Sequence, residues 1–177
     1  MKGLIVVDAQ NDFVSGSLAV PGAELILPVI QRLVDAGPEI LIATRDWHPV
    51  DHCSFVAEPE YRDGSWPKHC VQFTRGAAFA WQHPGGLTDI VSKGTDRDRE
   101  AYSGFDGTGL ADKLRGYGVD SVEIVGLALD YCVAATAIDA AEAGFDTAVI
   151  LDGTRAVTEG TAADACDRME AAGVELR

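Results

Sequence analysis

Basic residues are scarce in this sequence. It contains 14 lysine and arginine residues against 28 aspartate and glutamate residues, which gives a formal net charge of −14 at pH 7. A chain of this kind lacks the positive surface that attracts the phosphates of nucleic acids or of anionic membranes. We therefore expect neither nucleic acid nor a membrane among its partners, and most of its acidic residues should lie on a solvated face.

Cysteine and long apolar runs are also scarce. The four cysteines form no C-x-x-C pair, so we expect reduced thiols and no disulfide framework. No apolar run approaches the length of a membrane span, and the first one ends at Asp8, too early for a signal peptide. These features predict a cytoplasmic protein, either a monomer or a homo-oligomer. The cysteines are Cys53, Cys70, Cys132 and Cys166.

Apolar runs that alternate with alanine-rich, helix-favouring stretches make up the rest of the chain. Its 177 residues, 19 of them glycine, contain no repeat, linker or low-complexity segment. We predict a single domain over residues 1–177 in the α/β class. Strands are expected over residues 3–7, 39–44, 89–92, 119–125, 146–151 and 174–176, and helices over 23–35, 109–118, 133–143 and 161–172.

The stretch around Cys132 organises this pattern. An apolar run over 122–125 predicts a buried strand, Gly126 interrupts it, and the sequence from Val133 favours a helix that Asp130 could cap. Cys132 would then lie in a strand-to-helix turn. There, the helix dipole and free backbone N–H groups would lower the pKa of the thiol and could hold an oxyanion. The alternative is a buried structural cysteine.

Asp8 and Lys93 each stand at the end of a predicted strand. The carboxyl ends of parallel strands form the edge where open α/β sheets bind ligands. Asp8 can be a loop anchor, or a general base if partial burial raises the pKa of its carboxyl group. Lys93 can be a solvated surface residue, or it can point into the same crevice and stabilise a thiolate or a developing negative charge.

A long polar loop over residues 45–70 combines one carboxylate with three histidines: Asp46, His48, His52 and His69. Long irregular loops in compact domains are usually functional. Imidazole and carboxylate ligands select zinc, iron or manganese over calcium, and a bound ion would organise the loop. The alternative is a set of unrelated surface histidines.

Together these motifs resemble the isochorismatase-like cysteine hydrolases, in order and over essentially the whole chain. Two motifs, near Trp66 and Tyr102, resemble the nicotinamidase/pyrazinamidase branch of that superfamily. The motifs are Asp8-x-Gln10-Asn11-Asp12-Phe13, Asp46-Trp47-His48, Trp66-Pro67-x-His69-Cys70, Lys93-Gly94, Tyr102-Ser103-Gly104-Phe105 and Gly126-x-x-x-Asp130-Tyr131-Cys132-Val133.

The resemblance implies a doubly wound, mainly parallel sheet of six strands with helices on both faces. It implies a catalytic triad of Asp8, Lys93 and Cys132, and an oxyanion hole formed by the backbone N–H groups of Ala128 and Cys132, with a cis peptide before Ala128. It further implies metal ligation by Asp46, His48, His52 and His69, and contacts to the substrate ring from Phe13, Trp66 and Tyr102.

The implied activity is the hydrolysis of nicotinamide, and of pyrazinamide, to the acid and ammonia through a thioester on Cys132, a reaction that feeds NAD salvage. The implied cofactor is one divalent metal ion, zinc first, with iron or manganese as alternatives. Two other functions remain open from the sequence. One is another small-amide or N-carbamoyl amidohydrolase of the same superfamily, and the other is a catalytically silent metal-binding domain on this fold.

Overall fold

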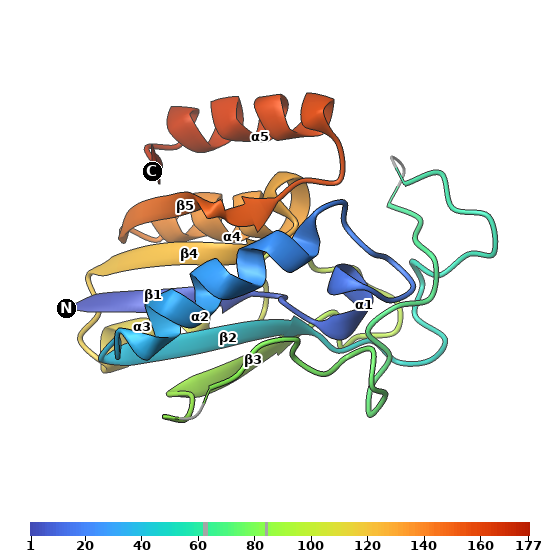
Figure 1. The fold of residues 1–177 in the computed structure, drawn as a ribbon, viewed down its shortest axis with the longest axis horizontal. Coiled ribbons are helices and arrows are strands. Elements are labelled where there is room, and N and C mark those ends of the chain that lie inside the picture. Colours follow the sequence, from blue (N-terminus) through green and yellow to red (C-terminus); the bar gives the residue numbers. More distant parts are fainter. Residues whose placement is uncertain (62–63, 84) are drawn as a thin grey trace.

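Six parallel strands form one sheet at the centre of the molecule (Figure 1). The computed structural model describes residues 1–61, 64–83 and 85–177, and places the strands in the order β3-β2-β1-β4-β5-β6. The strands are β1 (Lys2–Val7), β2 (Ile40–Asp46), β3 (Asp89–Lys93), β4 (Ser121–Leu127), β5 (Asp146–Arg155) and β6 (Glu175–Leu176). Every strand pair is parallel, which confirms the predicted doubly wound, six-stranded fold.

Helices cover both faces of the sheet, so its central strands are buried on both sides. In β1, Leu4 and Val6 face a core shared with Ile30 of α2, while Ile5 faces a second core that includes Leu114 of α3. This two-sided burial explains why the strand reads as a continuous apolar run. The helical elements are α1 (Asn11–Val14), η1 (Ala23–Ile26), α2 (Leu27–Asp35), α3 (Leu110–Gly116), η2 (Leu129–Val133), α4 (Ala134–Glu142) and α5 (Glu159–Ala171).

The strand order changes direction between β1 and β4. From β1 the chain proceeds outward to β2 and β3 on one side, and later to β4, β5 and β6 on the other. At this switch point Gly126 has a φ of +123°, and a Cβ atom there would lie 1.9 Å from the carbonyl oxygen of Val7. Only glycine lets the two strand ends approach so closely.

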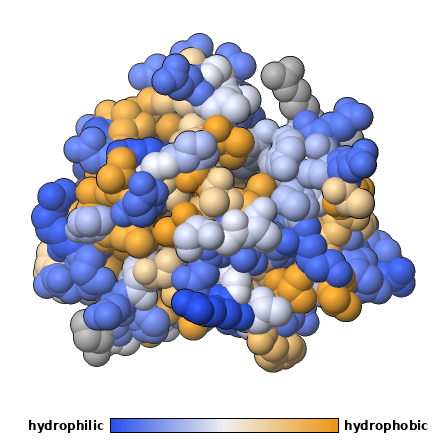
Figure 2. Space-filling model, turned by 45° about the vertical axis from the view of Figure 1, so that its right-hand side comes forward, coloured by the Kyte–Doolittle hydropathy of each residue, from blue (hydrophilic) through white to orange (hydrophobic). Residues whose placement is uncertain are grey.

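The carboxyl ends of the strands open onto the long loops at one edge of the sheet, on the right of Figure 1. The predicted polar loop over 45–70 lies there, although residues 62 and 63 are outside the described part of the chain. Figure 2 turns this side forward and shows apolar groups interspersed among mostly polar ones. No helix within the described ranges is long and apolar enough to cross a membrane.

Several predicted boundaries shift. The helix expected over 23–35 begins with the 3₁₀ turn η1, and α2 starts only at Leu27, because Pro28 is tolerated in a first helical turn but not further inside. After β4 the chain forms a π-helical turn, η2, before α4. The prediction that Asp130 caps this helix was wrong, since the N-cap of η2 is Ala128 and that of α4 is Val133.

Candidate active site

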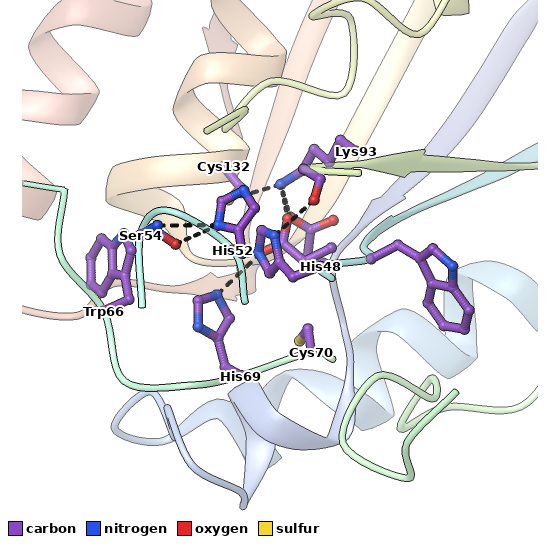
Figure 3. Close-up of polar contacts among 12 residues, drawn as sticks. His48, His52, Ser54, Trp66, His69, Cys70, Lys93 and Cys132 are labelled. Carbon is purple, nitrogen blue, oxygen red and sulfur yellow. Dashed lines mark hydrogen bonds and ion pairs between the residues drawn. The ribbon is translucent and has the colours of Figure 1, made fainter. Parts of the chain in front are cut away.

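The side chain of Lys93 contacts both other predicted catalytic residues, Asp8 and Cys132. Figure 3 shows its ammonium group next to Cys132. Asp8 follows β1, Lys93 ends β3 and Cys132 lies in η2 after β4, so three strand ends supply them. The ammonium nitrogen of Lys93 lies 2.8 Å from Asp8 Oδ2 and 3.3 Å from Cys132 Sγ. It also donates hydrogen bonds to Asp46 Oδ1 and to the carbonyl oxygen of Ala101, the latter at 3.2 Å. Residues far apart in the sequence therefore meet in one buried cluster.

The charges of this cluster follow from its burial. Burial opposes a charged Lys93, but Asp46 and Asp8 outweigh it and hold the lysine pKa well above its usual value. Burial likewise opposes ionisation of Asp46, but Lys93 and the neighbouring histidines hold the pKa of Asp46 well below its usual range. We infer a permanent ammonium–carboxylate pair between these two residues.

The pKa of Asp8 is shifted in the opposite direction to that of Asp46, because at Asp8 the effect of burial exceeds that of the Lys93 ammonium. Burial raises the pKa of Asp8 even though the Lys93 ammonium and the Thr44 hydroxyl group, 2.7 Å from Asp8 Oδ1, favour the charged form. The backbone of Asp8 has a φ of +44°, a region that residues other than glycine rarely adopt. Its surroundings therefore hold a carboxyl group in an uncommon conformation with a raised proton affinity, as a general base requires.

The predicted lowering of the Cys132 pKa was wrong. Cys132 is only 6% exposed, and burial raises the pKa of its thiol well above the usual value, although the Lys93 ammonium acts in the opposite direction. The carboxylates of Asp8 and Asp46 raise it further. The position of Cys132 in a turn before a helix does not overcome these effects. The thiol is therefore protonated at rest and needs a proton acceptor before it can act as a nucleophile.

Asp46, His48 and His69 converge on one space next to this cluster. Asp46 Oδ2 lies 3.5 Å from His48 Nε2 and 3.6 Å from His69 Nε2. The Nδ1 atoms of the two rings face carbonyl oxygens, of Gly94 at 2.9 Å and of Pro67 at 2.8 Å. Each Nδ1 must therefore carry the proton, which leaves the Nε2 lone pairs directed at the shared space.

This donor set fits a divalent metal ion. Ligand atoms of the three residues lie within 4.8 Å of one another, and all three residues are buried. His48 Nε2 is buried without a hydrogen-bond partner among the described residues, which is costly unless something binds it. Two imidazole nitrogens and a carboxylate oxygen, with carbonyls holding the rings from behind, suit zinc, iron or manganese.

His52 does not join this set. Its Nε2 donates a hydrogen bond to the carbonyl oxygen of Arg99 at 3.1 Å, and its Nδ1 accepts one from the Ser54 hydroxyl at 2.8 Å. Both ring nitrogens are therefore engaged away from Asp46. The His52 ring packs against that of His48 at a centroid distance of 4.2 Å, so His52 supports a ligand. Of the four predicted ligands, three, including Asp46, therefore converge on one space and His52 lies apart from them, because spacing along a loop does not determine where a ring points.

Two side chains to which the sequence gave no role, the buried Gln10 and the half-buried Asp12, hold the candidate metal-binding segments in place. Gln10 accepts a hydrogen bond from the Asp46 backbone N–H and donates one to the Asp46 carbonyl oxygen, both at 2.8 Å. Asp12 accepts one from the backbone N–H of Cys70, next to His69, at 2.8 Å. Both residues lie in the motif that follows Asp8, so that motif contained the signal.

A narrow aromatic slot opens above Cys132. The three residues predicted to surround the substrate ring all line it, together with residues that had no predicted role. Its free volume is about 30 Å³, room for about two water molecules. The lining comprises Phe13, Leu18, Val20, Asp46, Trp66, His69, Glu100, Tyr102, Ala128, Tyr131, Cys132 and Val157.

The walls of the slot are apolar but contain fixed polar groups. The indole N–H of Trp66 donates a hydrogen bond to the hydroxyl oxygen of Tyr102 at 3.1 Å. Burial raises the pKa of Tyr102 to about 12, so the phenol stays neutral. The predicted cis peptide is confirmed between Leu127 and Ala128, and both residues of the predicted oxyanion hole, Ala128 and Cys132, belong to the slot. Glu100, which no sequence signal identified, adds a carboxylate to the wall.

Comparisons with known proteins show what the whole chain is similar to. A family model described as Isochorismatase domain matches residues 2–177. The chain is 43% identical over 190 residues to the nicotinamidase/pyrazinamidase of Mycobacterium tuberculosis, with 99% of this chain and 98% of that protein covered. The solved structure of the pyrazinamidase of Pyrococcus horikoshii in complex with zinc matches with a TM-score of 0.90 and 42% identity, covering 99% of this chain and 98% of that one. The yeast nicotinamidase bound to the inhibitor nicotinaldehyde matches with a TM-score of 0.87 and 37% identity over 99% of both chains.

Proposed function

This chain belongs to the isochorismatase family, and we propose that it is a nicotinamidase that hydrolyses nicotinamide, and also pyrazinamide, to the acid and ammonia. One observation carries the proposal. A single buried ammonium, that of Lys93, lies within 3.3 Å of both a carboxylate and a thiol at the base of an aromatic slot. A general base, a nucleophile and a flat apolar slot are what the hydrolysis of an aromatic carboxamide requires.

The reaction begins with proton transfer from the Cys132 thiol to the Asp8 carboxylate. Burial raises the pKa of the Asp8 carboxyl group and so makes its carboxylate a stronger base than a free one, as removal of a proton from the buried thiol requires. Lys93 remains an ammonium and stabilises the thiolate 3.3 Å away. The thiolate then adds to the amide carbon.

The charge that develops on the amide oxygen needs hydrogen-bond donors. We assign this role to the backbone N–H groups of Ala128 and Cys132, both of which belong to residues lining the slot. One such donor is worth about 10²–10³ in rate. As the carbon–nitrogen bond breaks, the carboxyl proton of Asp8 passes to the departing amino group and ammonia leaves.

The remaining thioester is hydrolysed by the same residues in the reverse roles. Asp8, again a carboxylate, takes a proton from water while the oxygen adds to the thioester carbon. The carbon–sulfur bond then breaks, the acid is released, and the proton on Asp8 restores the Cys132 thiol.

Asp46, His48 and His69 would hold one divalent ion, which we propose to be zinc. When bound, this ion supplies a Lewis acid to which the ring nitrogen of a pyridine or pyrazine can coordinate, and so fixes the orientation of the ring. Phe13, Trp66 and Tyr102 would contact its faces and edges. Gln10 keeps Asp46 in position by bonding its backbone, while Lys93 keeps it ionised.

The wider setting is also part of the proposal. We propose that residues 1–177 act as one hydrolase domain in the cytoplasm and contribute to NAD salvage. The acidic composition supports a protein that acts on small molecules and binds neither nucleic acid nor membranes.

The test is ammonia release from nicotinamide by the purified enzyme, with and without a chelator. Turnover of nicotinamide that is lost with the chelator and restored by zinc is expected. N-carbamoyl compounds and small aliphatic amides serve as competing substrates. A preference for one of them by tenfold or more in kcat/KM would replace nicotinamidase with another amidohydrolase of the family, and no turnover of any amide would favour a silent domain.

A further inference from the structure

One buried carboxylate bonds the turn that contains Cys132 to α5, a helix that is distant in the sequence. Asp130, only 6% exposed, lies two residues before Cys132 in η2. Its carboxylate accepts hydrogen bonds from the backbone N–H of Val157, at 3.0 and 3.1 Å to its two oxygens, and from that of Thr158 at 3.4 Å. It also accepts one from the hydroxyl group of Thr161 at 2.5 Å. All of these donors precede α5 or lie in its first turn.

The location of this carboxylate favours a strong attachment. The first turn of α5 presents unpaired N–H groups and the positive end of the helix dipole, both of which stabilise a negative charge. The α5 helix has its own N-cap, since the Thr158 side chain accepts a hydrogen bond from the Thr161 N–H at 3.2 Å. The bonds to Asp130 are therefore additional to normal capping and connect α5 to the turn.

The turn itself needs such an attachment. In η2 the carbonyl oxygen of Ala128 accepts hydrogen bonds from the backbone N–H of Val133 at 3.0 Å and of Tyr131 at 3.1 Å, in place of a regular α-helical ladder. Turns of the π type are uncommon and often occur at functional sites. Their backbone positions depend on neighbours more than those of a regular helix do.

The same carboxylate also fixes part of the slot. Val157, whose backbone N–H bonds to Asp130, lines the slot together with Cys132. We propose that Asp130 is a positioning residue: by binding the start of α5 it sets the Cys132 sulfur against Lys93 and Asp8. This inference rests on the proposed function of Cys132 as the nucleophile.

Positioning matters here because the key contact leaves little tolerance. The Lys93 ammonium lies 3.3 Å from Cys132 Sγ, so a shift of about 1 Å breaks the contact. A misplacement of this size can cost about 10²-fold in rate. The loss should appear mainly in kcat, because Phe13, Trp66 and Tyr102, which we propose contact the ring, come from other segments.

The test measures steady-state kinetics and thiol alkylation in the metal-loaded enzyme. Asp130→Ala is expected to lower kcat for nicotinamide about 100-fold with KM changed less than threefold. Asp130→Asn keeps one acceptor oxygen and should lose about tenfold. The rate of Cys132 alkylation by iodoacetamide, followed by mass spectrometry, should change by at least tenfold in Asp130→Ala, because the sulfur leaves its buried site, while the exposed Cys53 reacts at an unchanged rate as an internal reference.

A stability-matched control separates positioning from general weakening of the fold. Ala163→Gly weakens the interior of the same helix by about 1 kcal/mol at an exposed position and changes none of the residues bonded to Asp130. It should lower the melting temperature and keep kcat within twofold. A kcat in Asp130→Ala within threefold of wild type, or an equal loss in Ala163→Gly, would overturn the proposal.

Failure of a variant to fold and failure of the proposed function give results that differ from failure of the positioning role. If Asp130→Ala does not fold, Asp130→Asn decides the question by the same criteria, with a kcat within twofold of wild type as the contrary result. If the wild-type enzyme does not hydrolyse nicotinamide, the proposed function fails. The relative alkylation rates of Cys132 in wild type and variants still decide the role of Asp130, since they require no substrate.

Discussion

Gly94 offers a sharp test of the metal-binding geometry, because two separate features exclude a side chain there. Its φ is +59°, and a Cβ atom would lie 2.4 Å from His48 Cε1 and 2.6 Å from His48 Nδ1. Gly94→Ala must therefore strain the backbone and also displace the His48 ring, whose Nδ1 bonds the Gly94 carbonyl oxygen at 2.9 Å. Gly37 provides the control, since its φ is +71° but a Cβ atom there would have no neighbour within 4 Å.

The two variants should differ by the cost of the contact. Left-handed backbone costs a non-glycine residue about 1–2 kcal/mol, which both variants incur. Overpacking against His48 adds about 1–3 kcal/mol in Gly94→Ala alone. A difference of about 2 kcal/mol corresponds to a melting temperature about 4–8 °C lower in Gly94→Ala than in Gly37→Ala for a chain of this size.

The functional difference should be larger than the difference in stability. Loss of a group that orients a metal ligand typically costs about 10–100-fold in metal affinity. Metal content after dialysis, measured by inductively coupled plasma mass spectrometry, should therefore fall in Gly94→Ala and stay at the wild-type level in Gly37→Ala. Equal metal content and equal melting temperatures in the two variants would refute the proposed location of His48.

Three further predictions test the catalytic and metal-binding residues separately. Cys132→Ala should abolish turnover with metal content unchanged, because Asp46, His48 and His69 supply the proposed ligands; residual turnover near the wild-type rate would exclude the nucleophile. His52→Ala should retain most of its metal while His48→Ala loses it, because His52 engages both ring nitrogens elsewhere; equal depletion in metal analysis would restore His52 as a ligand. Because burial raises the pKa of Asp8 and only its carboxylate accepts a proton, kcat/KM should fall as the pH falls through a value above the usual 3.9 or so; a pH–rate profile that stays flat down to that value would contradict this role.

Local sequence determined the elements and the chemistry available to this protein. Apolar runs such as residues 3–7 predicted strands buried on both faces, because a parallel sheet with helices on both sides leaves no solvated side. Residue types at strand ends then predicted where reactive groups would gather, since parallel strands end at one edge. The sequence therefore predicted the α/β class and the meeting of Asp8, Lys93 and Cys132.

Only the tertiary structure decided how those groups are oriented and charged. Whether His52 binds a metal depends on Ser54 and Arg99, and the second of these is distant in sequence. The pKa of the Cys132 thiol rises because the fold buries it beside two carboxylates, although its position before a helix predicted the opposite. Asp130 was predicted to cap the helix that follows it, but its carboxylate bonds Val157 and Thr161 at the start of α5, which only the fold brings near. Desolvation and non-local hydrogen bonds arise only when distant segments pack, so local patterns do not contain them.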